Sequence, residues 1–182
     1  MSIKSSVFIA TSLDGFISRI DGSIDWLDEA SKDVPVEEDC GYLEFITSID
    51  VLVIGRHSYE KVLSFGEWPY KEKRTVVLSS KDLKIPKELE ETVSSSSESP
   101  TDLVKRLSDE GAKHLYVDGG ITIQRFLNEG LIDELTITTI PILLGEGRPL
   151  FGPTKKDISL RLIETKKYDF GFVQLKYQVN KV

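Results

Sequence analysis

The sequence has little of what secreted, membrane-spanning and metal-binding proteins require. Cys40 is the single cysteine, so no internal disulfide can form, and the two histidines, His57 and His114, cannot supply a three-histidine metal site. No apolar run approaches the roughly 18 residues of a membrane span, and the apolar stretch near the N-terminus is too short for a signal peptide. We therefore expect a soluble cytoplasmic protein with no bound metal and no membrane partner.

Positive charge is also scarce. The chain has 23 Lys and Arg against 30 Asp and Glu, a formal net charge of -7, which argues against a nucleic-acid partner. An anionic ligand would have to be attracted locally, against the average field of the protein. The 182 residues, 40% of them hydrophobic, suit one domain over residues 1–182 with its own core.

Short apolar runs alternate with segments of helical spacing through the first two thirds of the chain. Residues 51–54 form an uninterrupted β-branched and apolar run, typical of a strand covered on both faces. Residues 36–46 keep helical spacing with acidic residues first, a second helix is expected from Thr101, and the serine run 94–97 is interpreted as a surface loop. This alternation predicts an α/β fold with a mostly parallel, twisted central sheet and helices on both faces.

Two other segments have distinct patterns. Residues 160–168 and 172–179 surround an Asp-Phe-Gly turn and predict an antiparallel hairpin at one edge of the sheet. Near the N-terminus, Ile24, Trp26 and Leu27 follow a polar stretch, as expected of a mobile loop that docks over a cleft.

Residues suited to phosphate binding follow three of the expected strands. In an open α/β sheet, ligands bind beyond the carboxyl ends of the parallel strands, where helix N-termini converge. The two glycines that follow the fourth strand allow backbone N–H groups to approach a pyrophosphate, although such a pair also makes a tight turn. An arginine after the second strand suits a phosphate monoester or simply points into water, and two serines after the third suit the same phosphate or a polar strand end. The candidate residues are Gly55, Arg56, His57, Ser58, Leu78, Ser79, Ser80, Gly119, Gly120, Ile121 and Thr122.

One carboxylate is a candidate for proton transfer. If Asp39 faced the cleft from the first helix, burial would raise its pKa and let it relay a proton to a bound heterocycle. The alternative is that it belongs to an acidic helix start without a catalytic role.

Taken together, the chain resembles the dihydrofolate reductase-like superfamily, and within it the branch of the reductase domain of bacterial riboflavin biosynthesis, the RibD C-terminal domain. The resemblance covers nearly the whole chain and predicts a three-layer, dihydrofolate-reductase-like fold. It depends on five segments in the same order: Ser-Leu-Asp-Gly at 12–15, Gly-Arg-His-Ser at 55–58, Leu-Ser-Ser at 78–80, Asp-Gly-Gly at 118–120, and Pro-Ile-Leu-Leu-Gly-Glu-Gly-Arg-Pro-Leu-Phe at 141–151.

The resemblance implies an NADPH-dependent reductase that transfers a hydride to a small heterocyclic or sugar substrate. Arg56, Ser79 and Ser80 would hold the adenosine 2′-phosphate, and Ala10 with Ile17 would contact the nicotinamide. The pyrophosphate would bind His57, Ser58 and residues 119–122. A homodimer is implied as well.

The substrate remains open because the chain departs from the riboflavin pattern. Phe16 replaces the lysine that usually follows Ser-Leu-Asp-Gly, and the Gly-Arg-His-Ser segment replaces a stretch whose surroundings handle a ribose phosphate. The expected activity resembles that of 5-amino-6-(5-phosphoribosylamino)uracil reductase. Dihydrofolate reduction, or nucleotide binding without catalysis, are the alternatives.

Overall fold

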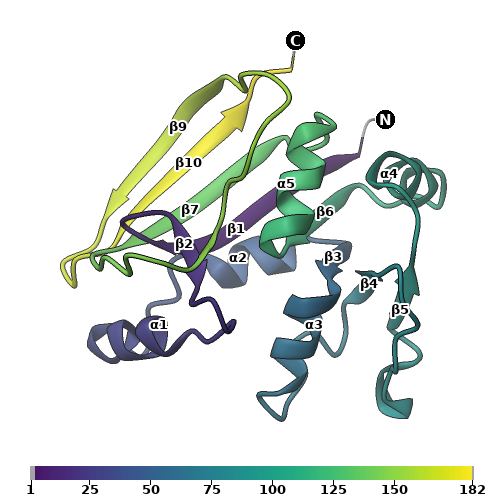
Figure 1. Ribbon diagram of the computed structural model, residues 1–182, viewed down its shortest axis with the longest axis horizontal. Helices are drawn as coiled ribbons and strands as arrows, with labels where there is room; N and C mark the ends of the chain where they lie inside the picture. Colours follow the sequence, from purple (N-terminus) through teal and green to yellow (C-terminus); the bar gives the residue numbers. More distant parts are fainter. Residues whose placement is uncertain (1–2, 182) are drawn as a thin grey trace.

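The computed structural model describes residues 3–181 and is built on an eight-stranded sheet of order β5-β4-β3-β6-β1-β7-β10-β9 (Figure 1). The strands from β5 to β7 pair in parallel, and β10 is antiparallel to both β7 and β9. The strands are β1 (Lys4–Ser12), β3 (Val51–Gly55), β4 (Arg74–Leu78), β5 (Val93–Ser96), β6 (His114–Asp118), β7 (Glu134–Ile140), β9 (Leu160–Lys167) and β10 (Val173–Val179). The predicted parallel sheet with a C-terminal antiparallel hairpin is confirmed.

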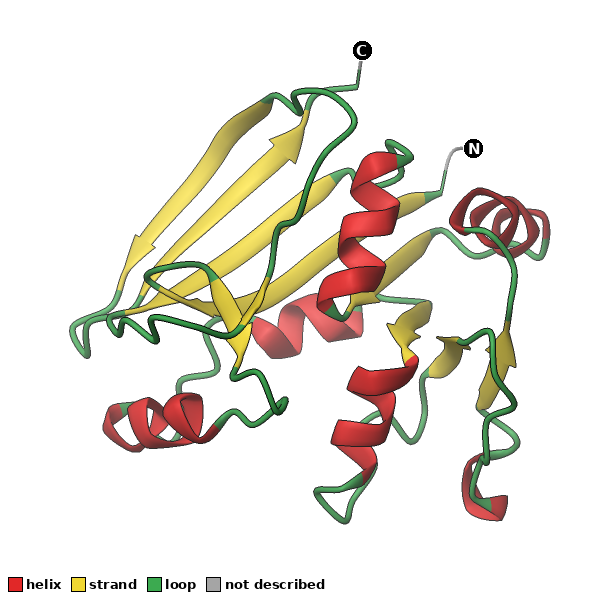
Figure 2. Ribbon diagram, viewed as in Figure 1, coloured by secondary structure: helices red, strands yellow, loops and turns green. Residues whose placement is uncertain are grey.

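Helices cover both faces of the sheet (Figure 2). Side chains of a strand alternate between its two faces, and in β3 the even and odd positions enter different cores. Val51 and Val53 pack with residues of α4 and α5, whereas Leu52 and Ile54 pack with residues of α2 and α3. These helices are α2 (Tyr42–Thr47), α3 (Arg56–Leu63), α4 (Pro100–Asp109) and α5 (Gly120–Asn128). The three-layer prediction is therefore confirmed.

Smaller elements gather beside this sheet. The strands β2 (Phe16–Ser18) and β8 (Arg148–Pro149) form a two-stranded sheet of their own. The remaining helices are α1 (Asp25–Ala30) and the short 3-10 helices η1 (Ser31–Asp33) and η2 (Lys87–Leu89). Within residues 3–181, no helix combines the length and the apolar character needed to cross a bilayer.

Two predictions about helix starts are wrong. The helix expected over residues 36–46 begins only at Tyr42, because Cys40 (φ 54°) and Gly41 (φ 81°) both adopt the left-handed conformation, which cannot continue a helix. The later helix begins at Pro100 rather than at Thr101, and Ser99 caps it by accepting a hydrogen bond from the backbone N–H of Asp102 at 3.1 Å.

Two expected loops are regular structure instead. Most of the serine run belongs to β5, which pairs in parallel with β4 at the edge of the sheet, where small polar side chains are tolerated. The expected mobile loop contains α1, whose Trp26 is only 2% exposed and packs with Ile140 and Phe172. Trp26 therefore anchors this segment to the sheet.

Candidate functional site

The candidate site lies at the carboxyl edge of the central strands. β3 and β6 are neighbours, with Ile54 opposite Asp118, and each leads directly into a helix. α3 begins at Arg56 immediately after β3, and α5 begins at Gly120, one residue beyond β6. The first turn of a helix has unpaired backbone N–H groups and a partial positive charge, so two such starts at one edge form an anion-binding surface.

Two glycines allow these helix starts to touch. A Cβ on Gly55 would lie 2.6 Å from the Thr122 hydroxyl, and a Cβ on Gly119 would lie 2.7 Å from the Ser58 hydroxyl. Both separations are far below a normal contact, so a larger residue at either position would force the facing hydroxyl to move. Gly119 also has φ +94°, which side chains disfavour. The structure thus brings together four of the predicted residues, Gly55, Ser58, Gly119 and Thr122.

The nicotinamide contacts implied by the resemblance lie beside these residues. A Cβ on Gly120 would lie 2.9 Å from the Ile17 side chain, so β2 crosses directly over the start of α5. Ala10 is partly buried in β1, opposite Thr138 of β7. Ile121, on the first turn of α5, is 69% exposed, which leaves an apolar side chain open to solvent at this edge.

Asp14 joins the first motif to the last. Its carboxylate accepts hydrogen bonds from the Ser12 hydroxyl at 2.6 Å and from the backbone N–H groups of Gly145 at 2.8 Å and Leu144 at 3.2 Å. The Ser12 hydroxyl is the main cause that lowers the pKa of Asp14, and the two N–H groups add to it. The Ser-Leu-Asp-Gly turn and the long glycine-rich loop are therefore one structural unit that frames the site.

The predicted 2′-phosphate residues are near this edge but are held by other partners. The Arg56 guanidinium donates to Glu60 at 2.9 Å and lies 3.4 Å from the His57 ring. Ser79 follows β4, next to β3, and its hydroxyl donates to the carbonyl of Lys81. Among residues 3–181, no hydrogen bond joins Arg56 to Ser79 or Ser80. Leu78 is buried in the core.

Asp39 does not have the environment that was expected. It is exposed in the turn before α2, where its carboxylate accepts hydrogen bonds from the backbone N–H groups of Leu43 and Gly41, each at 2.8 Å. These N–H groups lower the pKa of Asp39, so the expected rise through burial is wrong. Asp39 caps the helix, and its predicted role as a proton donor has no support in this geometry.

Asp118, the last residue of β6, is the carboxyl group that burial does affect. Its side chain is half-buried at the base of the Gly119 turn, and this loss of water raises its pKa to about 6, although the Gly119 backbone N–H favours the charged form. Neither cause is a cation. Asp118 in turn raises the pKa of Tyr42, Tyr70 and Tyr116, after the larger effect of their own burial.

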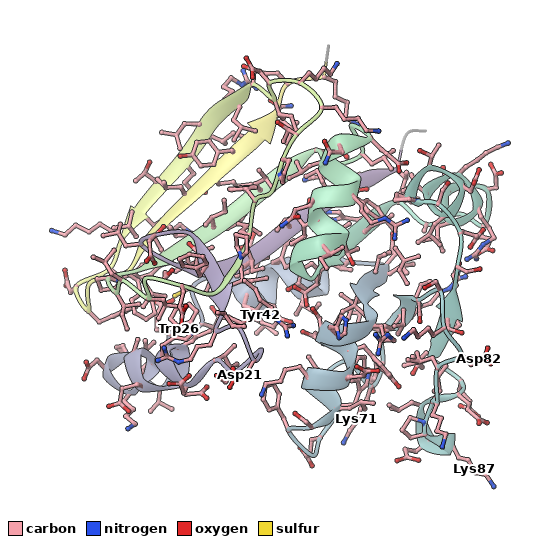
Figure 3. All side chains as sticks on the ribbon, in the orientation of Figure 1. Asp21, Trp26, Tyr42, Lys71, Asp82 and Lys87 are labelled. Atoms are coloured by element: carbon pink, nitrogen blue, oxygen red, sulfur yellow. The ribbon has the colours of Figure 1, made fainter. Side chains whose placement is uncertain are left out.

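Aromatic packing holds Tyr42 and Tyr70 in place. The Tyr42 ring meets Phe8 edge to face at 5.6 Å, and Tyr70 meets Trp68 at 5.2 Å. Tyr42 and Tyr70 each influence the pKa of the other, so α2 and the segment after α3 come close together here. Figure 3 labels Tyr42 near the middle of the molecule, above Asp21 and Lys71 in this view.

Sequence reasoning missed this carboxyl group and its tyrosines. Asp118 could have been found, because an acidic residue at the end of a buried strand, directly before a glycine pair, lies in the region where ligands bind. Tyr70 gave no such signal, because it lies in an irregular stretch and only the folded chain brings it to Tyr42.

Comparisons with known proteins agree with this architecture. The family model described as the RibD C-terminal domain matches residues 5–174. The uncharacterized protein YwjB of Bacillus subtilis is 37% identical over 180 residues, which cover 97% of this chain and 98% of YwjB. A second uncharacterized protein of the same organism, YyaP, is 30% identical and is covered to 93% of its length.

Solved structures show the same fold. A Shewanella sp. PV-4 protein named for riboflavin biosynthesis has a TM-score of 0.91 and 39% identity, with 98% of this chain and all of that chain covered. A Thermotoga maritima deaminase and 5-amino-6-(5-phosphoribosylamino)uracil reductase, 16% identical, has a TM-score of 0.73 and shares the fold over 57% of its length. The chain described here belongs to the RibD C-terminal domain family.

Proposed function

We propose that this protein is an NADPH-dependent reductase that transfers a hydride to a C=N or C=O group of a small heterocyclic or sugar substrate. The observation that carries the proposal is the pair of close approaches between Gly55 and Thr122 and between Gly119 and Ser58. Together they hold the starts of α3 and α5 against each other at one sheet edge, where the unpaired N–H groups of both helices would meet an incoming pyrophosphate. Helix N-termini and small residues are the usual means of binding a dinucleotide.

The adenosine 2′-phosphate would bind Arg56, Ser79 and Ser80. Arg56 is the first residue of α3, and its side chain is only partly exposed. Its ion pair with Glu60 keeps the guanidinium close to the protein surface. A phosphate dianion competes well with one exposed carboxylate for a guanidinium, because the phosphate has more acceptor oxygens and a larger negative charge. Binding would therefore exchange the Glu60 contact for the phosphate.

The nicotinamide would lie between Ala10 and Ile17, beside the Gly120 turn. When bound, the cofactor supplies the hydride, and the protein supplies orientation. Ile17 is held over Gly120 by the small sheet of β2 and β8, and Gln124 fixes β8 by donating to the carbonyls of Pro149 and Leu150. This support makes the position of Ile17 rigid.

We assign the proton to Asp118. Reduction of a C=N or C=O group places the hydride on carbon and requires one proton on the nitrogen or oxygen. With a pKa of about 6, the Asp118 carboxyl can donate that proton near neutral pH and regain it from water. Tyr42, Tyr70 and Tyr116 are the other titratable groups around it, and all three stay protonated because burial raises their pKa.

Titration with NADPH and NADH tests the proposal. Trp68 packs on Tyr70, so its fluorescence should report binding near Asp118. We expect both nucleotides to bind, NADPH more tightly, and Arg56→Ala to remove the preference. Arg125→Ala, which removes an exposed guanidinium from the last turn of α5, is the matched control. If neither nucleotide binds, the proposal is wrong.

Two alternatives have different signatures. Turnover of dihydrofolate would favour dihydrofolate reductase activity. NADPH binding without oxidation of NADPH by any pyrimidine, imine or ketone substrate would favour a nucleotide-binding protein without catalysis.

We also propose that the chain forms a homodimer through β9. This edge strand is exposed at all eight positions, including Leu160, Leu162 and Ile163. An open edge with apolar side chains is a natural place for a second copy to pair. Sedimentation as a single species of 20.5 kDa would contradict it.

A further inference from the structure

A stretch of irregular chain leads from β8 to β9 and runs along one side of α5 (Figure 1). Its first part, residues 149–155, begins at the last residue of β8, and we call it the strap. Two half-buried side chains of α5, Gln124 and Asn128, are one helical turn apart on the same face and hydrogen-bond to the strap. The strap is therefore fixed at two points along the helix.

Gln124 holds the beginning of the strap. Its side-chain amide donates to the carbonyls of Pro149 at 3.2 Å and of Leu150 at 3.1 Å. The backbone N–H of Leu150 in turn donates to the carbonyl of Gly15 at 3.0 Å. Gln124 is therefore connected, through a single residue of the strap, to the turn that precedes β2.

The Pro149 carbonyl lies on the first turn of α5, against the same residue as Ile17. A Cβ on Gly120 would lie 3.2 Å from this carbonyl oxygen and 2.9 Å from the Ile17 side chain. Pro149 also pairs with Phe16, the residue before Ile17. The position of Ile17 over Gly120 thus depends on the position of Pro149, which Gln124 holds.

Asn128 holds the far end of the strap. Its side-chain amide donates to the carbonyl of Pro153 at 3.1 Å, and its side-chain oxygen accepts from the backbone N–H of Lys155 at 2.9 Å. Within residues 3–181, no side-chain hydrogen bond of Asn128 reaches β2 or β8. Each anchor therefore makes two hydrogen bonds to the strap, but the bonds of Gln124 are the ones next to Ile17.

Gly152 leaves room for the Gln124 amide. A Cβ at this position would lie 2.5 Å from the Oε1 of Gln124 and 2.9 Å from its Cδ. Gly152 is not among the glycines with positive φ, so a methyl group here adds no backbone strain. The atoms that such a methyl group would displace are the end of a flexible side chain.

From these contacts we propose that Gln124 is a positioning residue for the cofactor: through Pro149 it sets the height of Ile17 above Gly120 and, with it, the orientation of the nicotinamide. The inference rests on the proposed reductase function, because the nicotinamide is expected beside Ile17. In the described part of the chain, the side-chain hydrogen bonds of Gln124 all go to the strap, so it should orient the ring without holding the phosphates. Hydride transfer is sensitive to such placement, because a shift of about 1 Å can slow a reaction by about 10²-fold.

The bound cofactor can report the orientation of its own ring. Wild-type protein, Gln124→Ala and Asn128→Ala are each saturated with NADPH, and the induced circular dichroism and fluorescence anisotropy of the dihydronicotinamide are measured together with the Kd. Asn128→Ala is the matched control, because it removes the same number of strap hydrogen bonds one helical turn away. We expect Gln124→Ala to lose at least about half of the induced dichroism while its Kd changes by less than about threefold, since the helix starts bind the phosphates. Asn128→Ala should keep the wild-type dichroism.

Gly152→Ala disturbs the same contact from the strap. Its methyl group should displace the Gln124 amide and reproduce the loss of dichroism, with little loss of stability in denaturant unfolding. The double variant Gly152→Ala with Gln124→Ala should lose no more dichroism than either single variant, because both changes act on one contact. Unchanged dichroism in Gln124→Ala, an equal loss in Asn128→Ala, or additive losses in the double variant would overturn the proposal.

The Kd of the wild-type protein for NADPH is measured first. Wild-type protein that binds no NADPH would refute the reductase function itself. Wild-type protein that binds NADPH with the same dichroism as Gln124→Ala would refute only the positioning role of Gln124.

Discussion

The carboxyl edge of the sheet has two sides of opposite character, and both meet at the Gly119 turn. On the proposed cofactor side, which comprises residues 55–58, 79–80 and 119–122, helix starts, glycines and one arginine suit phosphates. On the proposed substrate side, which comprises residues 14–44 and Asp118, carboxylates predominate. A net charge of -7 describes neither side, because residues 14–44, with ten Asp and Glu against two Lys and Arg, account for all of it.

The carboxylates themselves show why the two sides differ. Asp14 and Asp39 each accept hydrogen bonds from two or more donors at the surface, and these donors lower their pKa. Asp118 has a single backbone donor in buried surroundings, and its pKa is raised to about 6. Hydrogen-bond supply and access to water, rather than charge alone, decide which carboxyl group can hold a proton near neutral pH.

The largest effect is expected from Asp118→Asn, which keeps the shape of the side chain and removes its acid. If Asp118 supplies the proton, kcat should fall by roughly 10²–10⁴-fold, the usual range for a general acid, while the Kd of NADPH changes little. Steady-state kinetics and fluorescence titration separate the two. A parallel loss of NADPH affinity would show that the two sides of the edge are not independent.

The same substitution should stabilise the fold at neutral pH. Because the folded pKa of Asp118 is raised above the unfolded value of 3.8, the favourable contribution of the protonated form is complete below pH 3.8 and is lost as the pH rises through about 6. Asp118→Asn should therefore increase the free energy of unfolding by up to about 3 kcal/mol at pH 7 and by little at pH 4. Denaturant unfolding at both pH values measures this, and equal changes would contradict the assigned pKa.

The cofactor side can be disturbed by a single methyl group. Gly55→Ala introduces no backbone strain, because φ is -75°, but its Cβ would lie 2.6 Å from the Thr122 hydroxyl. We expect the free energy of unfolding to fall by up to about 3 kcal/mol, the usual cost of overpacking, and NADPH affinity to fall with it.

The double variant Gly55→Ala with Thr122→Ala serves as the control, because it removes the hydroxyl that the new methyl group meets. Stability should recover in denaturant unfolding, whereas NADPH affinity should stay low if Thr122 binds the pyrophosphate. Full recovery of both quantities would remove Thr122 from the cofactor side.

Arg56→Ala tests the single fixed positive charge among the predicted cofactor residues. We expect it to weaken NADPH by roughly 1–3 kcal/mol and NADH hardly at all, because only NADPH has a 2′-phosphate. The measurement is the pair of dissociation constants for each nucleotide. Equal losses for the two nucleotides would mean that Arg56 contacts something other than the 2′-phosphate.

Periodic segments could be predicted from the sequence. The run at residues 51–54 predicts a buried strand because every residue is apolar, and both faces of β3 are indeed covered. The Asp-Gly-Gly turn and the Gly-Arg-His-Ser turn could be placed at one edge because consecutive parallel strands end on the same side. The contact between these two turns could not be predicted, because Gly55 and Thr122 are distant in the sequence and only the folded chain brings them together.

Local patterns failed where backbone conformation or neighbours overruled them. Residues 36–41 have helical spacing, but the left-handed Cys40 and Gly41 delay the helix to Tyr42, and this shift moves Asp39 out of the helix into a cap. The serines of β5 have low strand propensity, yet pairing with β4 makes them a strand. The substrate side was difficult to predict for the same reason, because Asp118, Tyr42 and Tyr70 come from three separate segments.

Asp39→Ala has the smallest expected effect and distinguishes the two carboxylates of the substrate side. Removing this capping carboxylate should lower the stability slightly, and the loss should appear mainly above the ordinary carboxyl pKa, since the folded pKa of Asp39 is lowered and the ionised form is the stabilising one. Asp39→Asn, which can still accept the N–H groups of Gly41 and Leu43, should recover most of it. We expect turnover to change by less than about fivefold in both variants, because the carboxylate is already committed to two backbone donors. If Asp39→Asn lost as much turnover as Asp118→Asn, Asp39 would be the proton donor. Its hydrogen bonds to Gly41 and Leu43 would then break during the reaction.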